Sequence, residues 1–116
     1  MVPHIINFEL DMAKKVIERT PLKQVKFMRF DVKINDVIHY AIRIGGWLDD
    51  HTDIARKFRG ELIGGRIDPG LIQKQGGGYL FLSAKGLSTN GSSGVYQAEE
   101  NRELTQKLLD DHFKQV

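Results

Sequence analysis

The sequence predicts a single α/β domain, in which a mixed β-sheet is flanked by two main helices. Segments 25–34 and 38–44 alternate apolar and polar residues as strands do, and 50–64 and 95–113 carry apolar residues at helical spacing. The 116 residues fit one core, and 41% hydrophobic with 28% charged residues is the composition of an ordinary globular domain. We therefore expect one domain over residues 1–116.

Residues 1–21 form an N-terminal extension whose pattern is ambiguous. Apolar residues recur at helical spacing from Ile6 to Ile17, but between Ile6 and Met12 they also alternate as in a strand. We favour a helix over the second half of 5–19, ended by Thr20-Pro21, because proline cannot continue a helix.

A hairpin follows. Its two alternating segments are joined by Asn35-Asp36, which is a turn signal. The alternation slips by one residue at Phe27-Met28, where we expect a β-bulge.

The segment around Asp50 predicts a helix start. Asp50 is a good N-cap, and Asp53 stands three residues later, as in a capping box with Asp in place of Glu. Ile54, Phe58 and Leu62 then form an apolar stripe. The helix is expected to end near Gly64-Gly65, a common C-terminal signal.

The remaining segments are predicted from turn residues and hydropathy. Residues 66–70 indicate a short strand that enters a tight turn, and 71–78 a glycine-ended connector. Residues 79–84 are apolar on both faces, which favours a central strand. A loop of small residues is expected at 86–94, followed by the helix at 95–113.

Two of these segments are candidate anion sites. His51 would lie in the first helical turn, beside backbone N–H groups that lack helical partners and attract phosphate. The helix start also favours neutral imidazole, so His51 is a candidate general base. In the 86–94 loop, backbone N–H groups can converge on an anion, with Ser88 or Thr89 adding a hydroxyl. The alternatives are a histidine packed under Trp47 and a loop that only connects.

Several function classes find little support. The chain has no cysteine, which excludes disulfides, thiolate nucleophiles and cysteine-ligated zinc. A metal site at 49–53 is disfavoured because no two histidines stand at ligand spacing, and a serine hydrolase because no nucleophile elbow is present. The net charge of +2 argues against nucleic acid, although Lys26, Arg29 and Lys33 make a basic hairpin. No segment is predicted to span a bilayer or to direct secretion, so a cytoplasmic protein is expected.

Taken in order, the motifs resemble the phosphohistidine phosphatase (Janus/Ocnus) family. That family has a tryptophan four residues before a histidine, which is followed by x-Asp-Ile at a helix start. The matching residues here are Trp47, His51, Asp53 and Ile54, and Arg43 falls where the family has an arginine. Its Gly-Gly-Arg-Ile segment is matched by 64–67, and its Gly-x-Ser-x-x segment by 86–90. The resemblance runs from about Leu22 to the last helix.

The resemblance implies a metal-independent phosphatase that uses no cofactor and acts on phosphohistidine or a related phosphoramidate. His51 would be the catalytic residue, either as the base that activates water or as a nucleophile. The expected phosphate or substrate contacts are Lys23, Thr52, Arg66, Ser88, Thr89 and Asn90, with Lys26 as the alternative to Lys23. The expected supporting residues are Arg43, Trp47 and Asp53.

The expected partner is a phosphorylated protein or a small phosphoramidate, with no nucleic acid and no membrane, and a monomer is expected. An alternative of another class is a non-catalytic module that binds phosphate or phosphoprotein in the same pocket. The residue before His51 is Asp50, where better-known family members have an aromatic side chain. A carboxylate at this position raises the pKa of the histidine and repels phosphate.

Overall fold

The computed structural model describes residues 15, 17–19, 23–45, 49–83, 86–91 and 102–114. Its strands are β1 (Gln24–Ile34), β2 (Val37–Ile44), β3 (Ile72–Ser83) and β4 (Gly86–Asn90). Its helices are α2 (His51–Gly64), α3 (Arg102–Lys114) and the short 3-10 helix η1 (Pro69–Leu71). Residues 15 and 17–19 are helical, as predicted for the end of the N-terminal extension, and the rest of that prediction lies outside the described residues.

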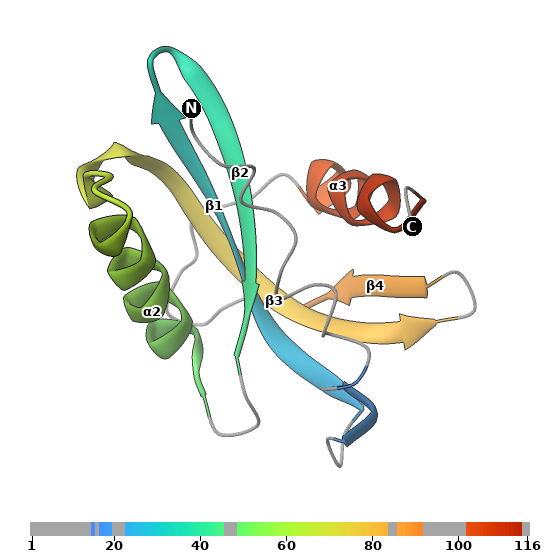
Figure 1. The fold of residues 1–116 in the computed structure, drawn as a ribbon. Coiled ribbons are helices and arrows are strands. Elements are labelled where there is room, and N and C mark those ends of the chain that lie inside the picture. The colour runs from blue at the N-terminus through green and yellow to red at the C-terminus, as the bar shows by residue number, and fades with distance from the viewer. Residues whose placement is uncertain are drawn as a thin grey trace.

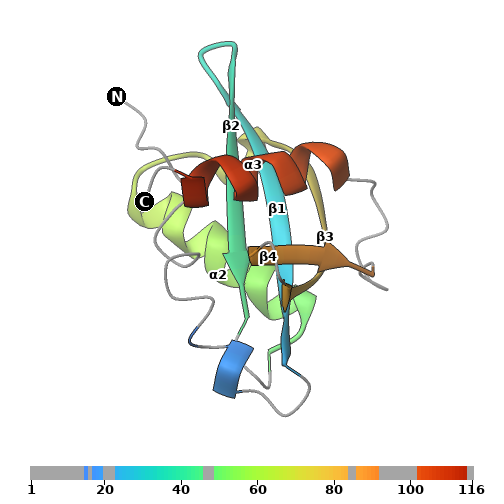
Figure 2. The same cartoon turned by 90° about the vertical axis from the view of Figure 1, so that its right-hand side faces the viewer.

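The strands form one sheet in the order β2-β1-β3-β4, with α2 on one face and α3 on the other (Figures 1 and 2). The predicted class, a single α/β domain with two main helices, is confirmed. Every described strand pair is antiparallel, so in this part of the chain the sheet is antiparallel where the sequence predicts a mixed one.

The predicted hairpin is confirmed. Ile34 pairs with Val37 across a two-residue turn. Asn35 and Asp36 have φ values of 51° and 64°, and positive φ at both turn residues is the geometry that matches the twist of paired strands.

The predicted bulge at Phe27-Met28 is wrong. The pairing of β1 with β2 is continuous there, and the register shift lies between Asp31 and Val32, against β3. The apparent slip arises because β1 is buried on both faces. Its odd-numbered apolar residues join the cluster under α3 (Ile17, Val25, Phe27, Ile42, Leu80 and Leu109). Its even-numbered ones join the cluster under α2 (Met28, Phe30, Val32, Ala41, Ile54, Ala55, Phe58 and Leu62).

Helix α2 begins at His51 and ends at Gly64, as predicted. Its apolar stripe packs onto the sheet, where the Phe58 ring stacks on Phe30 with centroids 4.2 Å apart. Because the capping residues and the stripe agree, the start of this helix is fixed relative to the sheet. That start carries His51.

Three predictions after α2 need correction. Residues 66–70 form no strand, and 71–78 are not a connector but enter β3 at Ile72. Residues 86–90 are the edge strand β4 rather than a loop. Of the predicted helix at 95–113, the described part is α3, and 92–101 lie outside the described residues.

The glycines of β3 explain why it was misread. Gly76, Gly77 and Gly78 are buried opposite β1. A Cβ on Gly77 would lie 2.1 Å from the carbonyl oxygen of Phe27 and 3.1 Å from His51 Cδ2. A strand can contain such glycines where another backbone or a side chain approaches closely, so a run that is typical of a flexible connector is here a close contact.

Candidate functional site

The site is built around His51, whose side chain lies between α2 and the glycine run of β3. The residue is buried, with 6% of its surface exposed, and its Nε2 lies 3.0 Å from the carbonyl oxygen of Gly78. A carbonyl can only accept, so in the neutral ring Nε2 carries the hydrogen and Nδ1 is the basic nitrogen. Within the described part of the chain, Nε2–Gly78 is the one hydrogen bond of the ring. Nδ1 is thus the atom that can take a proton.

The surroundings of His51 lower its pKa below the ordinary 6.5. Burial is the largest cause, and the positive charge of Lys26 acts in the same direction. The hydrogen bond to Gly78 and the carboxylate of Asp50 raise the pKa but do not outweigh burial. His51 is therefore neutral at pH 7 and able to act as a base.

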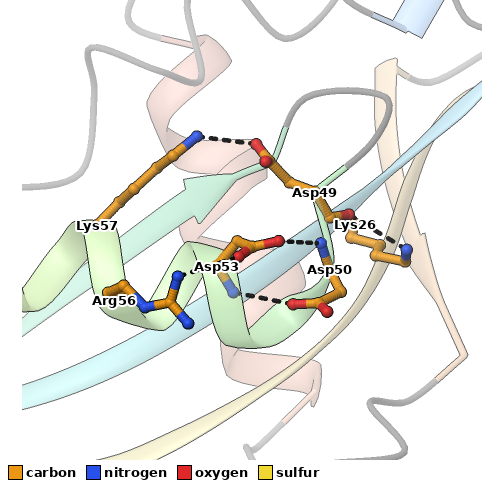
Figure 3. A network of polar contacts seen from close by, with 6 residues as sticks. All are labelled: Lys26, Asp49, Asp50, Asp53, Arg56 and Lys57. Atoms are coloured by element: carbon orange, nitrogen blue, oxygen red, sulfur yellow. Dashed lines mark hydrogen bonds and ion pairs between the residues drawn. The ribbon is translucent and has the colours of Figure 1, made fainter.

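The helix start beside His51 is closed by a reciprocal cap (Figure 3). The N–H of Asp53 donates to Asp50 Oδ1 at 2.9 Å, and the N–H of Asp50 donates to Asp53 Oδ2 at 3.0 Å. These bonds confirm the predicted capping box. Hydrogen bonding from the Asp53 N–H is the largest cause of a lowered Asp50 pKa, and the Thr52 N–H contributes. The amide of Thr52, predicted to hold phosphate, therefore already faces a carboxylate.

Of the two candidate lysines, Lys26 is the one near His51. Its Nζ donates to the backbone carbonyl of Asp49 at 3.2 Å (Figure 3). An ammonium has three N–H donors, and this bond uses one. Lys23, named first in the sequence prediction, instead donates to the carbonyl of Glu18 at 2.5 Å.

Strands β3 and β4 add polar groups to the same face of the sheet. Tyr79 pairs with Lys26 on one side and with Asn90 on the other, and side chains of directly paired residues project to the same face. The Tyr79 ring meets the His51 ring edge-on, with centroids 5.9 Å apart. Ser88 is two residues before Asn90, so both project towards the His51 face.

Thr89 projects to the opposite face. Its N–H and its Oγ1 lie 3.1 Å from Gln106 Oε1 of α3. The structure thus brings Ser88 and Asn90 to the His51 face and Thr89 to the α3 face.

Three other predicted residues lie elsewhere. Arg66 is exposed just beyond the far end of α2, about 20 Å from the helix start at 1.5 Å per residue. Arg43 is buried and holds the Glu61 carboxylate by hydrogen bonds of 3.0–3.2 Å, which ties the second half of α2 to β2. Trp47 lies outside the described residues.

Sequence reasoning missed two features that contact His51, the glycine run of β3 and Tyr79. The signal for the first was the run itself, since three consecutive glycines next to an aromatic, apolar strand can mark a close approach. Tyr79 lies in the segment 79–84, which the sequence predicts only as a central strand because it is apolar on both faces. Only the pairing with Lys26 and Asn90 brings it to the site.

Among the described residues, no group of three or more histidine, aspartate or glutamate side chains is placed to hold a metal ion. No helix in that part of the chain has the length and apolar character needed to cross a membrane. Comparisons with protein-family models, with curated proteins and with solved structures find no match for this chain.

Proposed function

We propose that this protein is a metal-independent phosphatase that hydrolyses phosphohistidine or a related phosphoramidate, with His51 as general base. The observation that carries the proposal is the buried, neutral imidazole, whose Nε2 donates to Gly78 and whose Nδ1 is the basic atom. A general base must be unprotonated to act, and a lowered pKa keeps His51 in that form at pH 7. The resemblance of its motifs to the phosphohistidine phosphatase family supports the same reaction.

In this proposal the phosphoryl group lies on the His51 face of the sheet. Lys26 supplies the positive charge, in place of Lys23, and Ser88 and Asn90 supply polar side chains from β4. Fixed donors around a transferring phosphoryl group stabilise the charge that develops on its oxygens. The proposed phosphate contacts are therefore Lys26, Ser88 and Asn90, and the Thr52 amide donates to the Asp50 carboxylate instead.

The proposed step consumes one water. The water oxygen forms a bond to phosphorus while His51 Nδ1 takes one of its protons. The P–N bond breaks and its electron pair stays on nitrogen, which then receives that proton. The products are the free amine or imidazole and inorganic phosphate.

The test is release of phosphate from a phosphohistidine peptide in EDTA by wild type, His51→Ala and His39→Ala. His39 is a matched control because it is also a histidine on this domain but pairs with Val32 near the hairpin end of β2. We expect His51→Ala to lose about 10³-fold in kcat, the scale of a general base, and His39→Ala to match wild type.

Equal turnover by wild type and folded His51→Ala would refute the role of His51. Binding of phosphopeptide without turnover by wild type would instead identify the non-catalytic module. Circular dichroism of each variant establishes that it is folded.

A further inference from the structure

The carboxylate of Asp50 is the feature of this site that a phosphate pocket does not need. Asp50 is exposed, it precedes His51 directly, and its charge raises the His51 pKa. Its own pKa is below 3.8, so it is negatively charged at any pH near neutral. A phosphate that approaches the helix start therefore meets a negative charge.

The charges around His51 are arranged with opposite signs. The Lys26 ammonium donates to the Asp49 carbonyl, and the Asp50 carboxylate caps α2, so both charges lie at the start of this helix (Figure 3). Neighbouring acidic groups have other partners: Asp49 pairs with Lys57 at 2.9 Å and Asp53 with Arg56 at 3.5 Å. The Asp50 carboxylate accepts hydrogen bonds from the backbone amides of Asp53 and Thr52. Among the described residues it forms no ion pair, and Lys26 is the cation whose charge acts on its pKa.

We propose that Asp50 selects phosphoramidates over phosphate esters by interacting with the positive charge of the leaving nitrogen. This inference rests on the proposed function. The nitrogen of a phosphoramidate, or the imidazole ring that contains it, can carry a proton, whereas the oxygen of a phosphate ester cannot do so at neutral pH. The Asp50 carboxylate repels the phosphate dianion of both substrates, but it attracts the protonated nitrogen group of the phosphoramidate. It therefore favours phosphoramidates over phosphate esters.

The positions of Lys26 and Asp50 also give the orientation of the substrate in the site. The phosphoryl oxygens lie towards Lys26 and the polar side chains of β4, and the leaving nitrogen lies towards Asp50. In the step described above, P–N cleavage leaves the nitrogen with the electron pair and a proton. The leaving group is then neutral, so the positive charge that Asp50 stabilises is that of a substrate whose nitrogen or imidazole ring is protonated before cleavage. In that case the proton taken by His51 passes to solvent. Asp50 itself exchanges no proton, because hydrogen bonds from the Asp53 and Thr52 backbone lower its pKa.

The experiment compares kcat/KM for two peptides of one sequence, carrying phosphohistidine or phosphotyrosine, at low salt. The proteins are wild type, Asp50→Asn and Asp49→Asn. Asparagine caps a helix as well as aspartate does, so Asp50→Asn removes the charge and keeps the fold. Asp49→Asn removes the same charge one residue away, from a carboxylate that is paired with Lys57.

We expect Asp50→Asn to lower the phosphohistidine-to-phosphotyrosine ratio of kcat/KM about fivefold, the scale of an exposed charge interaction, and 0.5 M salt to weaken the effect. Asp49→Asn should leave the ratio near that of wild type. An unchanged ratio in Asp50→Asn, with wild type active on phosphohistidine, would overturn the role of Asp50 and leave the proposed function intact. No turnover of either peptide by wild type would overturn the proposed function and, with it, this selectivity.

Discussion

Two buried polar side chains on opposite faces of the sheet, Arg29 under α3 and His51 under α2, have different surroundings. On the α3 face, Arg29 is 2% exposed and contacts Asp31 twice, as an ion pair of 2.9 Å from Nε and a hydrogen bond of 3.0 Å from NH2. Its NH1 donates to Thr105 of α3 at 3.0 Å. On the α2 face, His51 is neutral and bonds one backbone carbonyl.

This difference indicates a structural role for the Arg29–Asp31 pair and a chemical role for His51. The charges of Arg29 and Asp31 neutralise each other and hold α3 against β1. A change there should alter stability and not chemistry. His51 has one nitrogen that is fixed by Gly78 and a second that is basic, so a change there should alter chemistry more than stability.

We expect the largest loss of stability from a substitution on the α3 face. Asp31→Asn leaves the buried Arg29 charge without its counter-charge, and we expect the free energy of unfolding to fall by about 3 kcal/mol. Urea denaturation measures it. Turnover per folded molecule should stay near that of wild type, because Asp31 projects away from His51.

Two controls test whether the loss of stability in Asp31→Asn depends on the burial of the ion pair. The double variant Arg29→Met with Asp31→Leu removes both charges, and should recover most of the stability. Lys57→Met breaks an ion pair with the same 2.9 Å distance whose lysine is 65% exposed, and should change stability by no more than about 0.5 kcal/mol. If Lys57→Met cost as much as Asp31→Asn, burial would not be what distinguishes the pair on the α3 face.

On the α2 face we expect a smaller effect, a shift in the pH dependence of kcat/KM that His51 sets. The active form of His51 is unprotonated and its pKa is lowered, so activity should persist below pH 6.5 and fall as pH decreases through the lowered pKa. Lys26→Met removes a charge that lowers this pKa, so the acid limb should move to higher pH. Asp50→Asn removes a charge that raises it, so the limb should move to lower pH. Shifts of the same sign in both variants would contradict the charge assignment.

The same pKa predicts a stability change of known sign. The unfolded chain binds a proton at His51 near pH 6.5, and the folded chain does so only at lower pH. The unfolded state is therefore favoured as pH falls through the interval between these two values. The contribution of His51 to stability is complete above pH 6.5 and is lost below it. Urea denaturation of wild type at a series of pH values measures this contribution, with His51→Ala as the reference that lacks it.

The features that could be predicted from the sequence are those that depend on residues close together in the chain. Asp50 and Asp53 cap the helix that follows them, and Asn35-Asp36 turns the chain between adjacent strands. The wrong predictions concern segments whose structure depends on contacts with distant parts of the chain. Gly76–Gly78 is typical of a connector until β1 and His51 are packed against it.

The site itself was predicted in part for the same reason. His51 at the start of α2 followed from local signals. The choice of Lys26 over Lys23 depends on contacts between distant segments, because Lys26 of β1 bonds Asp49 beside α2, whereas Lys23, which precedes β1, bonds Glu18. Arg66 was assigned from a short motif, and the length of α2 separates it from His51. Tyr79 reaches the site only through pairing of β3 with β1 and β4.

The protonation of the two His51 ring nitrogens, measured by nitrogen-15 NMR at pH 7 with and without inorganic phosphate, shows whether His51 is the base of this site. We predict that Nε2 carries the hydrogen, that Nδ1 is unprotonated, and that phosphate shifts Nδ1 more than Nε2. A ring protonated on both nitrogens at pH 7, or a hydrogen on Nδ1 alone, would contradict the assignment of His51 as the base of this site.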